Sequence, residues 1–281
     1  MNRVVITGVG VVSPIGNNIE EFWGNVKQGN HGIQMIDRFD TTNLSVKVAG
    51  QVKDFNPLLS FSKKEIRHND LYCQYAVEAT RQAISDCGTD FKELDPYRIG
   101  VIVGSGIGGI HTFESEYRKF VEKGGRRVSP YTIPMLISNM AAGTIAIKYG
   151  FKGINYALVS ACATSTHTIG EAFTAIKHGR LDVCVAGGSE ACITEFTLAG
   201  FNNMKALSNS DNPDRASIPF DKDRDGFVMG EGGAVLILES LENAKKRNAK
   251  IYAEVVGYGV TEDAYHITSP DPTGEAACKQ F

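Results

Sequence analysis

Short, almost uninterrupted apolar runs alternate with segments of helical periodicity along most of this chain. The runs are RVVITG at 3–8, IGVIVG at 99–104 and GAVLILE at 233–239. A continuous apolar run of this length is typical of a strand that is buried on both faces. Strands that alternate with helices predict an α/β fold with a largely parallel sheet.

Capping residues mark the ends of several expected helices. Ser62 and Glu65 have the spacing of a capping box, and Gly88 is a stop signal, which together predict one long helix over 62–86. Gly29 and Gly179 end two further helical patterns. The other predicted helices cover 19–27, 112–123, 134–149, 162–178, 195–203 and 241–247, and the other strands cover 155–159, 182–186 and 251–260.

The composition is that of an ordinary globular protein. Hydrophobic residues make up 42% and charged residues 22% of the 281 residues, which supports a sizeable core and excludes intrinsic disorder. The 29 basic side chains are outnumbered by 32 acidic ones, and the net charge of −3 provides no global basic field to recruit nucleic acid. Any charged partner is therefore expected to bind a local patch.

Signal-peptide, membrane-span and cysteine patterns in the sequence indicate the cellular compartment. The opening MNRVVITGVGVVSPIG lacks the long apolar stretch and cleavage site of a signal peptide, and no run has the length of a membrane span. The six cysteines show neither CxxC pairs nor zinc-finger spacing. We therefore expect free thiols, no metal site and a cytoplasmic location, without a membrane partner.

The run GSGIGG at 104–109 matches the glycine pattern of a dinucleotide-binding turn. It follows a predicted strand and precedes a predicted helix, as that function requires. The second strand with its acidic residue is missing, because a helix and the turn GGRR at 124–127 occupy that region. The glycines can instead serve a tight turn and close backbone packing. A nicotinamide-dependent reductase therefore stands as an alternative function.

The run DKDRDG at 221–226 imitates the start of an EF-hand calcium loop. Position 12 of such a loop requires a bidentate acid, but Gly232 stands there and Glu231 is one residue short. We interpret the run as an ordered surface loop and not as a calcium site.

The run VSACATS at 159–165 carries the strongest local indication of chemistry. A short strand and a turn precede Cys162, which is expected to open a helix. The positive end of the helix dipole favours a thiolate there, and a thiolate is a nucleophile. His167 lies five positions further, about 140° around the helix, and is interpreted as structural. From the residues alone, a buried structural cysteine remains an equal alternative.

Several motifs in this order resemble a known family, the β-ketoacyl-acyl-carrier-protein synthases, and most closely the type II enzymes of bacterial fatty-acid synthesis. The motifs are TGVGVVSPIGN, GSGIGG, SPYTIPMLISNMAAG, VSACATSTHTIGEA, VAGGSE, IPFDKDRDGFVMGEGG and DAYHITSP, and they span nearly the whole chain. The resemblance implies a thiolase-like fold with layers α-β-α-β-α, of which this chain holds mainly the N-terminal half. It implies that residues 1–250 form that half and that 251–281 begin the second, truncated half.

The resemblance assigns roles to individual residues. Cys162 matches the cysteine that takes the acyl chain as a thioester, and its backbone N–H resembles one of two oxyanion donors. Ile107 and Phe201 resemble residues of the acyl pocket. Thr268 resembles a residue of the malonyl-pantetheine channel, with His266 beside it. No cofactor is expected for this chemistry.

The resemblance also implies partners. The expected ones are acyl- and malonyl-loaded acyl carrier protein and a second copy of the chain in a homodimer. Basic residues in segments that match the family's docking surface are expected to hold the acidic carrier; they are Lys63, Lys64, Arg67, Arg126, Arg127 and Lys205.

The family carries two catalytic histidines, a lysine and a GFGG loop in its C-terminal half, and the chain stops at Phe281 before any match to them. None of the six histidines matches the pair, so we do not expect this stretch alone to complete condensation. A non-catalytic chain-length partner subunit of the same fold is a second alternative, although such subunits usually lack the active cysteine that is present here.

Overall fold

One six-stranded sheet organises the protein, with the strand order β5-β4-β6-β7-β1-β8. The computed structural model describes residues 1–280. The strands of this sheet are β1 (Val4–Val12), β4 (Ile99–Gly104), β5 (Asn155–Tyr156), β6 (Val183–Glu190), β7 (Gly232–Ser240) and β8 (Ala253–Val255). A separate two-stranded sheet pairs β2 (Ile33–Met35) with β3 (Val48–Gly50).

The expectation of a largely parallel sheet is wrong at the level of neighbouring strands. Only β4 pairs in parallel, with β5 and with β6, whereas the pairs β6–β7, β7–β1 and β1–β8 are antiparallel. The reason lies between β6 and β7. Residues 191–231 form no crossover helix on a sheet face, and without a crossover the chain re-enters the sheet antiparallel.

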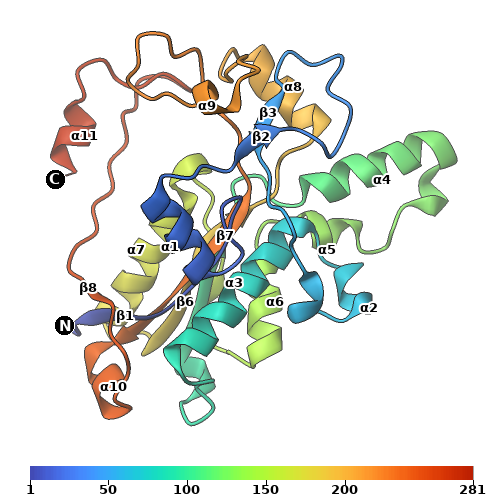
Figure 1. Ribbon diagram of the computed structural model, residues 1–281. Coiled ribbons are helices and arrows are strands. Elements are labelled where there is room, and N and C mark those ends of the chain that lie inside the picture. Colours follow the sequence, from blue (N-terminus) through green and yellow to red (C-terminus); the bar gives the residue numbers. More distant parts are fainter. Residues whose placement is uncertain (281) are drawn as a thin grey trace.

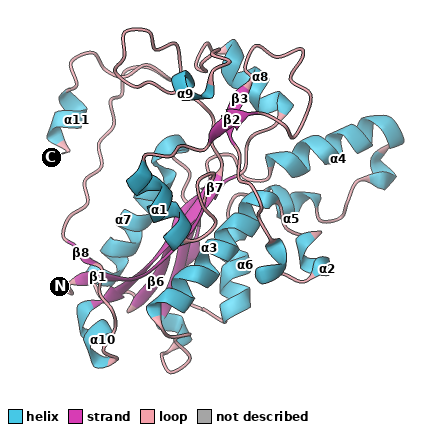
Figure 2. Cartoon of the chain, viewed as in Figure 1, coloured by secondary structure: helices cyan, strands magenta, loops and turns pink. Residues whose placement is uncertain are grey.

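Helices cover both faces of the sheet (Figures 1 and 2). On one face, α3 packs against β1 and β7 and α6 packs against β4; on the other face, α7 packs against β4 and β6. The helices are α1 (Ile19–Gln28), α2 (Lys63–Ile66), α3 (Leu71–Cys87), α4 (Ile110–Lys123), α5 (Thr132–Leu136), α6 (Met140–Tyr149), α7 (Thr164–Lys177), α8 (Glu195–Asn203), α9 (Pro213–Ala216), α10 (Leu241–Lys246) and α11 (Glu275–Lys279). Within residues 1–280, none of them has the length and apolar character of a transmembrane span.

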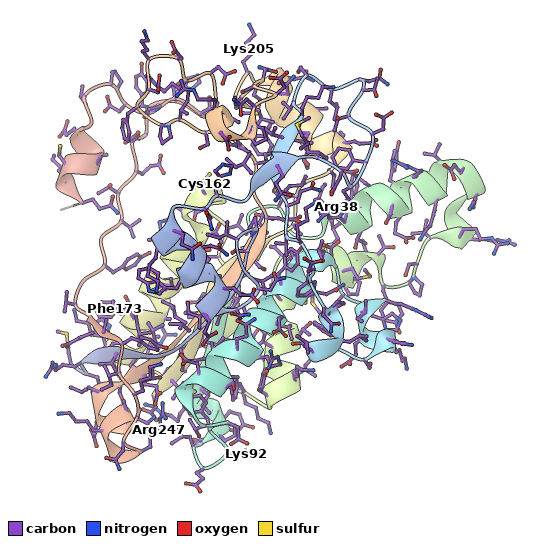
Figure 3. The ribbon with its side chains drawn as sticks, in the orientation of Figure 1. Arg38, Lys92, Cys162, Phe173, Lys205 and Arg247 are labelled. Atoms are coloured by element: carbon purple, nitrogen blue, oxygen red, sulfur yellow. The ribbon has the colours of Figure 1, made fainter. Side chains whose placement is uncertain are left out.

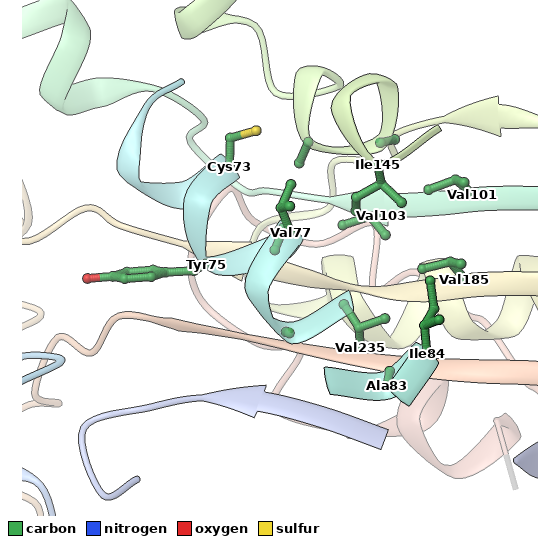
Figure 4. Packing of buried hydrophobic residues seen from close by; sticks show 14 of the residues in the cluster. Cys73, Tyr75, Val77, Ala83, Ile84, Val101, Val103, Ile145, Val185 and Val235 are labelled. Atoms are coloured by element: carbon green, nitrogen blue, oxygen red, sulfur yellow. The ribbon is translucent and has the colours of Figure 1, made fainter. Parts of the chain in front are cut away.

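The larger hydrophobic core lies between the sheet and the pair α3 and α6 (Figure 4). Val77 and Ala83 of α3 and Ile145 of α6 pack in it with Val101 and Val185 of the sheet, and all are buried. A second cluster joins α7 to the opposite face. Each fully buried Val, Leu or Ile side chain stabilises the fold by about 1.5–3 kcal/mol. The second cluster fixes α7, and the turn that precedes it, on the sheet.

The predicted helix 62–86 is two helices. The capping box of Ser62 and Glu65 and the stop at Gly88 are confirmed, but α2 ends after Ile66. Asp70 then caps α3: its Oδ1 accepts a hydrogen bond from the Tyr72 N–H (3.3 Å) and its Oδ2 one from the Thr112 N–H (2.9 Å). An Asp in this position favours a helix start, so the chain begins a new helix there.

Other boundaries also differ from the sequence-based expectation. The predicted helix 134–149 divides into α5 and α6, and the predicted strands 155–159 and 251–260 shorten to β5 and β8. Because β8 pairs with β1, residues 253–255 belong to the same sheet as the strands formed by the first 250 residues. Beyond β8 the chain leaves the sheet as an extended arm that carries α11 (Figure 1). The domain boundary at residue 250 stays a prediction.

Candidate active site

Cys162 lies in a short 3₁₀ turn, Ala161–Ala163, directly before α7. The sequence predicted that it opens the helix; the helix begins two residues later, at Thr164. The Cys162 side chain is exposed, and Figure 3 places it at the end of the sheet where α7 begins. Ala161 has a φ of +48°, a left-handed conformation that is uncommon for a residue with a Cβ. Cys162 thus sits on a sharp turn at the N-terminus of a 14-residue helix.

Hydrogen bonds hold this turn from both sides. The Ser160 N–H donates to Thr164 Oγ1 (2.9 Å), and the Ala163 N–H donates to the Ser160 carbonyl oxygen (3.0 Å). Ser160 Oγ lies 2.7 Å from His167 Nδ1. His167 therefore supports the turn through Ser160, which agrees with its interpretation as structural. The Cys162 N–H takes part in none of these bonds, which leaves it available to an incoming oxygen.

Cys162 opens into a cavity of about 690 Å³. Ile107 and Phe201, both predicted from the sequence, line this cavity together with Cys162. The ring of Phe201 meets that of Phe227 edge to face, with 5.8 Å between their centroids, and Phe227 also lines the cavity. Most of the lining residues come from the segments 11–14, 104–107, 161–165, 188–190 and 227–234. A largely apolar space of this size beside a thiol can hold an acyl chain.

His266 and Thr268 lie elsewhere. Both are exposed on the arm that follows β8, and neither lines the cavity of Cys162. His266 Nδ1 accepts hydrogen bonds from the backbone N–H groups of Thr268 (3.1 Å) and Ser269 (3.0 Å), which orders this part of the arm locally. Their assignment to a substrate channel stays a prediction.

The GSGIGG run wraps around a carboxylate of the chain itself. Glu190 Oε2 accepts a hydrogen bond from the Gly106 N–H (2.8 Å), and both of its oxygens lie 3.3 Å from the Ile107 nitrogen. Ser105 Oγ donates to Glu190 Oε1 (2.9 Å). Burial raises the pKa of Glu190, and the hydrogen bonds from this loop oppose the shift. A dinucleotide phosphate would need these same N–H groups, so the geometry does not favour the reductase alternative.

A second carboxylate of the cavity was missed by the sequence analysis as a site residue. The side chain of Glu231 is fully buried and accepts two hydrogen bonds from Arg38, at 2.6 and 2.9 Å. It also accepts bonds from the Val52 N–H (2.9 Å) and the Tyr75 hydroxyl (3.2 Å). Figure 4 shows the Tyr75 side chain leaving α3 in the direction away from Val101 and Val185. No local motif indicates Arg38, whose partner lies 193 positions away.

The six predicted docking residues are all exposed, but they do not form one patch. Lys63, Lys64 and Arg67 are on α2 and its C-terminal cap. His68 stacks on Tyr131 with 3.7 Å between ring centroids, which brings the end of α2 against the segment that follows the turn at 125–127. That turn contains Arg126 and Arg127. Lys205 follows α8 and lies far from α2 (Figures 1 and 3).

The aspartates of 221–226 are engaged within their own surface loop. Asp221 accepts a hydrogen bond from the Asp223 N–H (2.9 Å) and lies 3.4 Å from Arg215. These contacts support the interpretation of an ordered loop.

Comparison with known proteins decides the family. The N-terminal domain of the β-ketoacyl synthases matches residues 1–244. The chain belongs to the β-ketoacyl synthase family. It is 50% identical over 277 residues to the 3-oxoacyl-[acyl-carrier-protein] synthase 2 of Staphylococcus aureus (strain COL), an alignment that covers 99% of this chain and 67% of the relative.

Solved structures agree with this membership. A ketosynthase/chain length factor for ishigamide superposes with a TM-score of 0.90 at 31% identity, over 99% of this chain and 69% of that one. A type II polyketide ketosynthase in complex with its acyl-carrier protein superposes with a TM-score of 0.83 at 32% identity, over 99% and 68%. The thiolase-like α/β fold is therefore confirmed, and the β-ketoacyl synthase is an acyltransferase-type condensing enzyme.

Proposed function

We propose that the protein elongates fatty acids as a type II β-ketoacyl-acyl-carrier-protein synthase and that Cys162 takes the acyl chain. The observation that carries this proposal is the exposed Cys162 in the turn before α7, open to a cavity that Ile107 and Phe201 line. The name of the Staphylococcus aureus relative supports the same substrate class.

The first half-reaction is a thioester exchange. The sulfur of Cys162 attacks the carbonyl carbon of acyl-acyl-carrier protein, the new C–S bond forms, and the bond to the carrier's sulfur breaks. The carrier leaves as its thiol with the proton that Cys162 gave up. The unused Cys162 N–H is suited to stabilise the negative oxygen of the tetrahedral intermediate.

The second half-reaction joins two carbons from malonyl-acyl-carrier protein. Loss of carbon dioxide gives a carbanion that attacks the acyl-enzyme carbonyl, and the Cys162 thiolate leaves. Within residues 1–280 no histidine lines the cavity of Cys162, so we assign the residues around Cys162 to the acylation. The roles of His266 and Thr268 along the malonyl channel belong to this second step.

We place the carrier protein on the basic residues of α2 and of the turn 125–127, and we expect a cytoplasmic homodimer. The related ketosynthase solved with its acyl-carrier protein supports a carrier partner. The ketosynthase/chain length factor structure supports pairing of two such subunits. A purely non-catalytic subunit is disfavoured because the nucleophile is present and exposed.

The test is the mass of the acyl-enzyme. The full-length protein incubated with acyl-acyl-carrier protein is expected to gain the mass of one acyl group, and Cys162→Ala is expected to gain none because alanine offers no nucleophile. Cys278→Ala is the matched control, since Cys278 is also exposed. Acylation that survives Cys162→Ala, or a wild-type mass that does not change, would contradict the proposal.

A further inference from the structure

Glu190 is the last residue of β6 and holds the neighbouring loop with one carboxylate. Its two oxygens accept hydrogen bonds from the side chain of Ser105 and from the backbone N–H groups of Gly106 and Ile107. Ser105 Oγ in turn accepts a bond from the Gly108 N–H (3.0 Å). The whole stretch 105–108 is therefore ordered by a single acidic side chain that also lines the cavity.

The loop 105–108 packs closely against the turn that contains Cys162. A Cβ on Gly106 would lie 2.8 Å from Glu190 Oε2 and 3.5 Å from the Ala161 carbonyl oxygen. Gly106 therefore lies between the Glu190 carboxylate and Ala161, the residue before Cys162, where a larger residue would not fit. Ile107, a residue that is 37% exposed, follows directly and lines the cavity.

We propose that Glu190 is a positioning residue: it fixes the backbone of Ile107 relative to Cys162 and so sets how the pocket receives the distal part of an acyl chain. The inference rests on the proposed acyl transfer. A short acyl group that ends before Ile107 does not depend on this wall. A long chain does, because it must pack against the Ile107 side chain to bring its carbonyl carbon to Cys162.

The chemistry of the site requires a carboxylate. An ionised Glu offers acceptors on both oxygens, which match the donors from Ser105, Gly106 and Ile107. Glutamine keeps the shape but turns one acceptor into an NH₂ donor that faces another donor. The loop then loses at least one charge-assisted hydrogen bond while the turn of Cys162 keeps its own bonds through Ser160.

The experiment compares acylation rates of full-length wild type and Glu190→Gln with a two-carbon and a sixteen-carbon acyl-carrier-protein donor. We expect a loss of about tenfold with the long donor, the equivalent of about 1.4 kcal/mol, and less than about twofold with the short one. Alkylation of Cys162 by iodoacetamide is expected to keep its wild-type rate. Glu93→Gln, an exposed carboxylate beside Lys92 at the far end of the molecule (Figure 3), is the matched control.

Hydrogen exchange supplies a readout that does not need acyl transfer. The amides of Gly106 and Ile107 are expected to exchange faster in Glu190→Gln. If Glu190→Gln does not fold, Ser105→Ala removes one of the same bonds and is expected to show the same dependence on chain length. Equal losses with both donors, slowed alkylation or unchanged amide exchange would overturn the proposal. A wild-type protein that accepts neither donor would overturn the proposed function instead. The amide exchange of Gly106 and Ile107 would still test whether Glu190 orders the loop.

Discussion

Cys162 differs from most of the other cysteines in the solvent access of its sulfur. Cys73, Cys87, Cys184 and Cys192 are buried, whereas Cys162 and Cys278 are exposed. Burial raises the pKa of Cys73 and of Cys192 to about 12 and that of Cys87 to about 11, so these thiols stay protonated at neutral pH. A protonated thiol is a poor nucleophile.

These environments predict a ranking of thiol reactivity. Brief labelling of the full-length protein with iodoacetamide at pH 7.5–8 (roughly where an ordinary thiol is partly ionised) is expected to modify Cys162 first, because it precedes the positive end of α7. Cys278 reacts more slowly and the buried thiols stay unmodified. Peptide mapping by mass spectrometry measures the ranking. Modification of Cys73 or Cys184 as fast as Cys162 would contradict it.

At the scale of elements, local signals in the sequence predicted where helices begin and end, but they did not predict where a long helical pattern divides into two helices. Ser62 with Glu65 and the glycine after Cys87 act through neighbours a few positions away, so the sequence displays them. The break before α3 lies at Asp70, which caps α3 locally through the Tyr72 N–H but also bonds Thr112, 42 positions along the chain. Such a contact exists only in the folded chain, and a periodicity argument cannot include it.

The short helix α2 allows a test of carrier docking. Reversing two exposed charges, Lys64→Glu with Arg67→Glu, is expected to slow acylation from the acidic carrier roughly tenfold at low salt, because electrostatic steering is lost. The defect should shrink at high salt, where charges are screened beyond about 10 Å. Acylation from acyl-CoA is expected to change little.

The control for docking reverses two charges on another helix. Lys245→Glu with Lys246→Glu changes α10, which lies far from α2 (Figure 1), and is expected to leave both donors unaffected. Equal losses with carrier and with acyl-CoA in the α2 variant would indicate damage to the pocket. The docking surface would then have to be sought around Arg126, Arg127 and Lys205.

At the scale of the whole molecule, the proposed active-site cysteine and a buried ion pair lie at opposite ends of the sheet. Cys162 lies at one end, and Arg247 lies at the other (Figure 3). There the fully buried carboxylate of Glu239 pairs with Arg247 and accepts hydrogen bonds from Thr7 and from Asn243 (2.7 Å). This group ties β1, β7 and α10 together.

Loss of that carboxylate is expected to destabilise the protein. Glu239→Gln leaves Arg247, whose side chain is only 22% exposed, without its charged partner, at a cost of about 3 kcal/mol in the free energy of unfolding. Glu242→Gln is the control: it breaks a pair with Lys246 whose side chains are 78% and 71% exposed, and should cost less than about 0.5 kcal/mol. Urea unfolding measures both. Equal shifts of the two midpoints would refute the role of Glu239.

The same distinction between local and distant contacts limits what the sequence could say of the site. Cys162 stood out in its local run, but the roles of Cys162, Ile107 and Phe201 were assigned through the resemblance of several ordered motifs, and the three residues do line one cavity. The carboxylates that order the cavity were not, since Glu190 and Glu231 act on loops about 80 and 190 positions away. The antiparallel pairs were missed for the same reason, because β7 inserts between β6 and β1, and β1 lies at the distant start of the chain.

The position of β7 between β6 and β1 has a consequence for synthesis on the ribosome. β1 ends at Val12, and β7, the strand with which it pairs over nearly its full length, is completed only at Ser240. At a translation rate of about 5–20 residues per second, the first strand waits roughly 10–45 seconds for that neighbour. In this interval the apolar strand β1 stays without its partner β7 in the nascent chain, so we expect chaperones that shield such strands to influence the yield of folded protein.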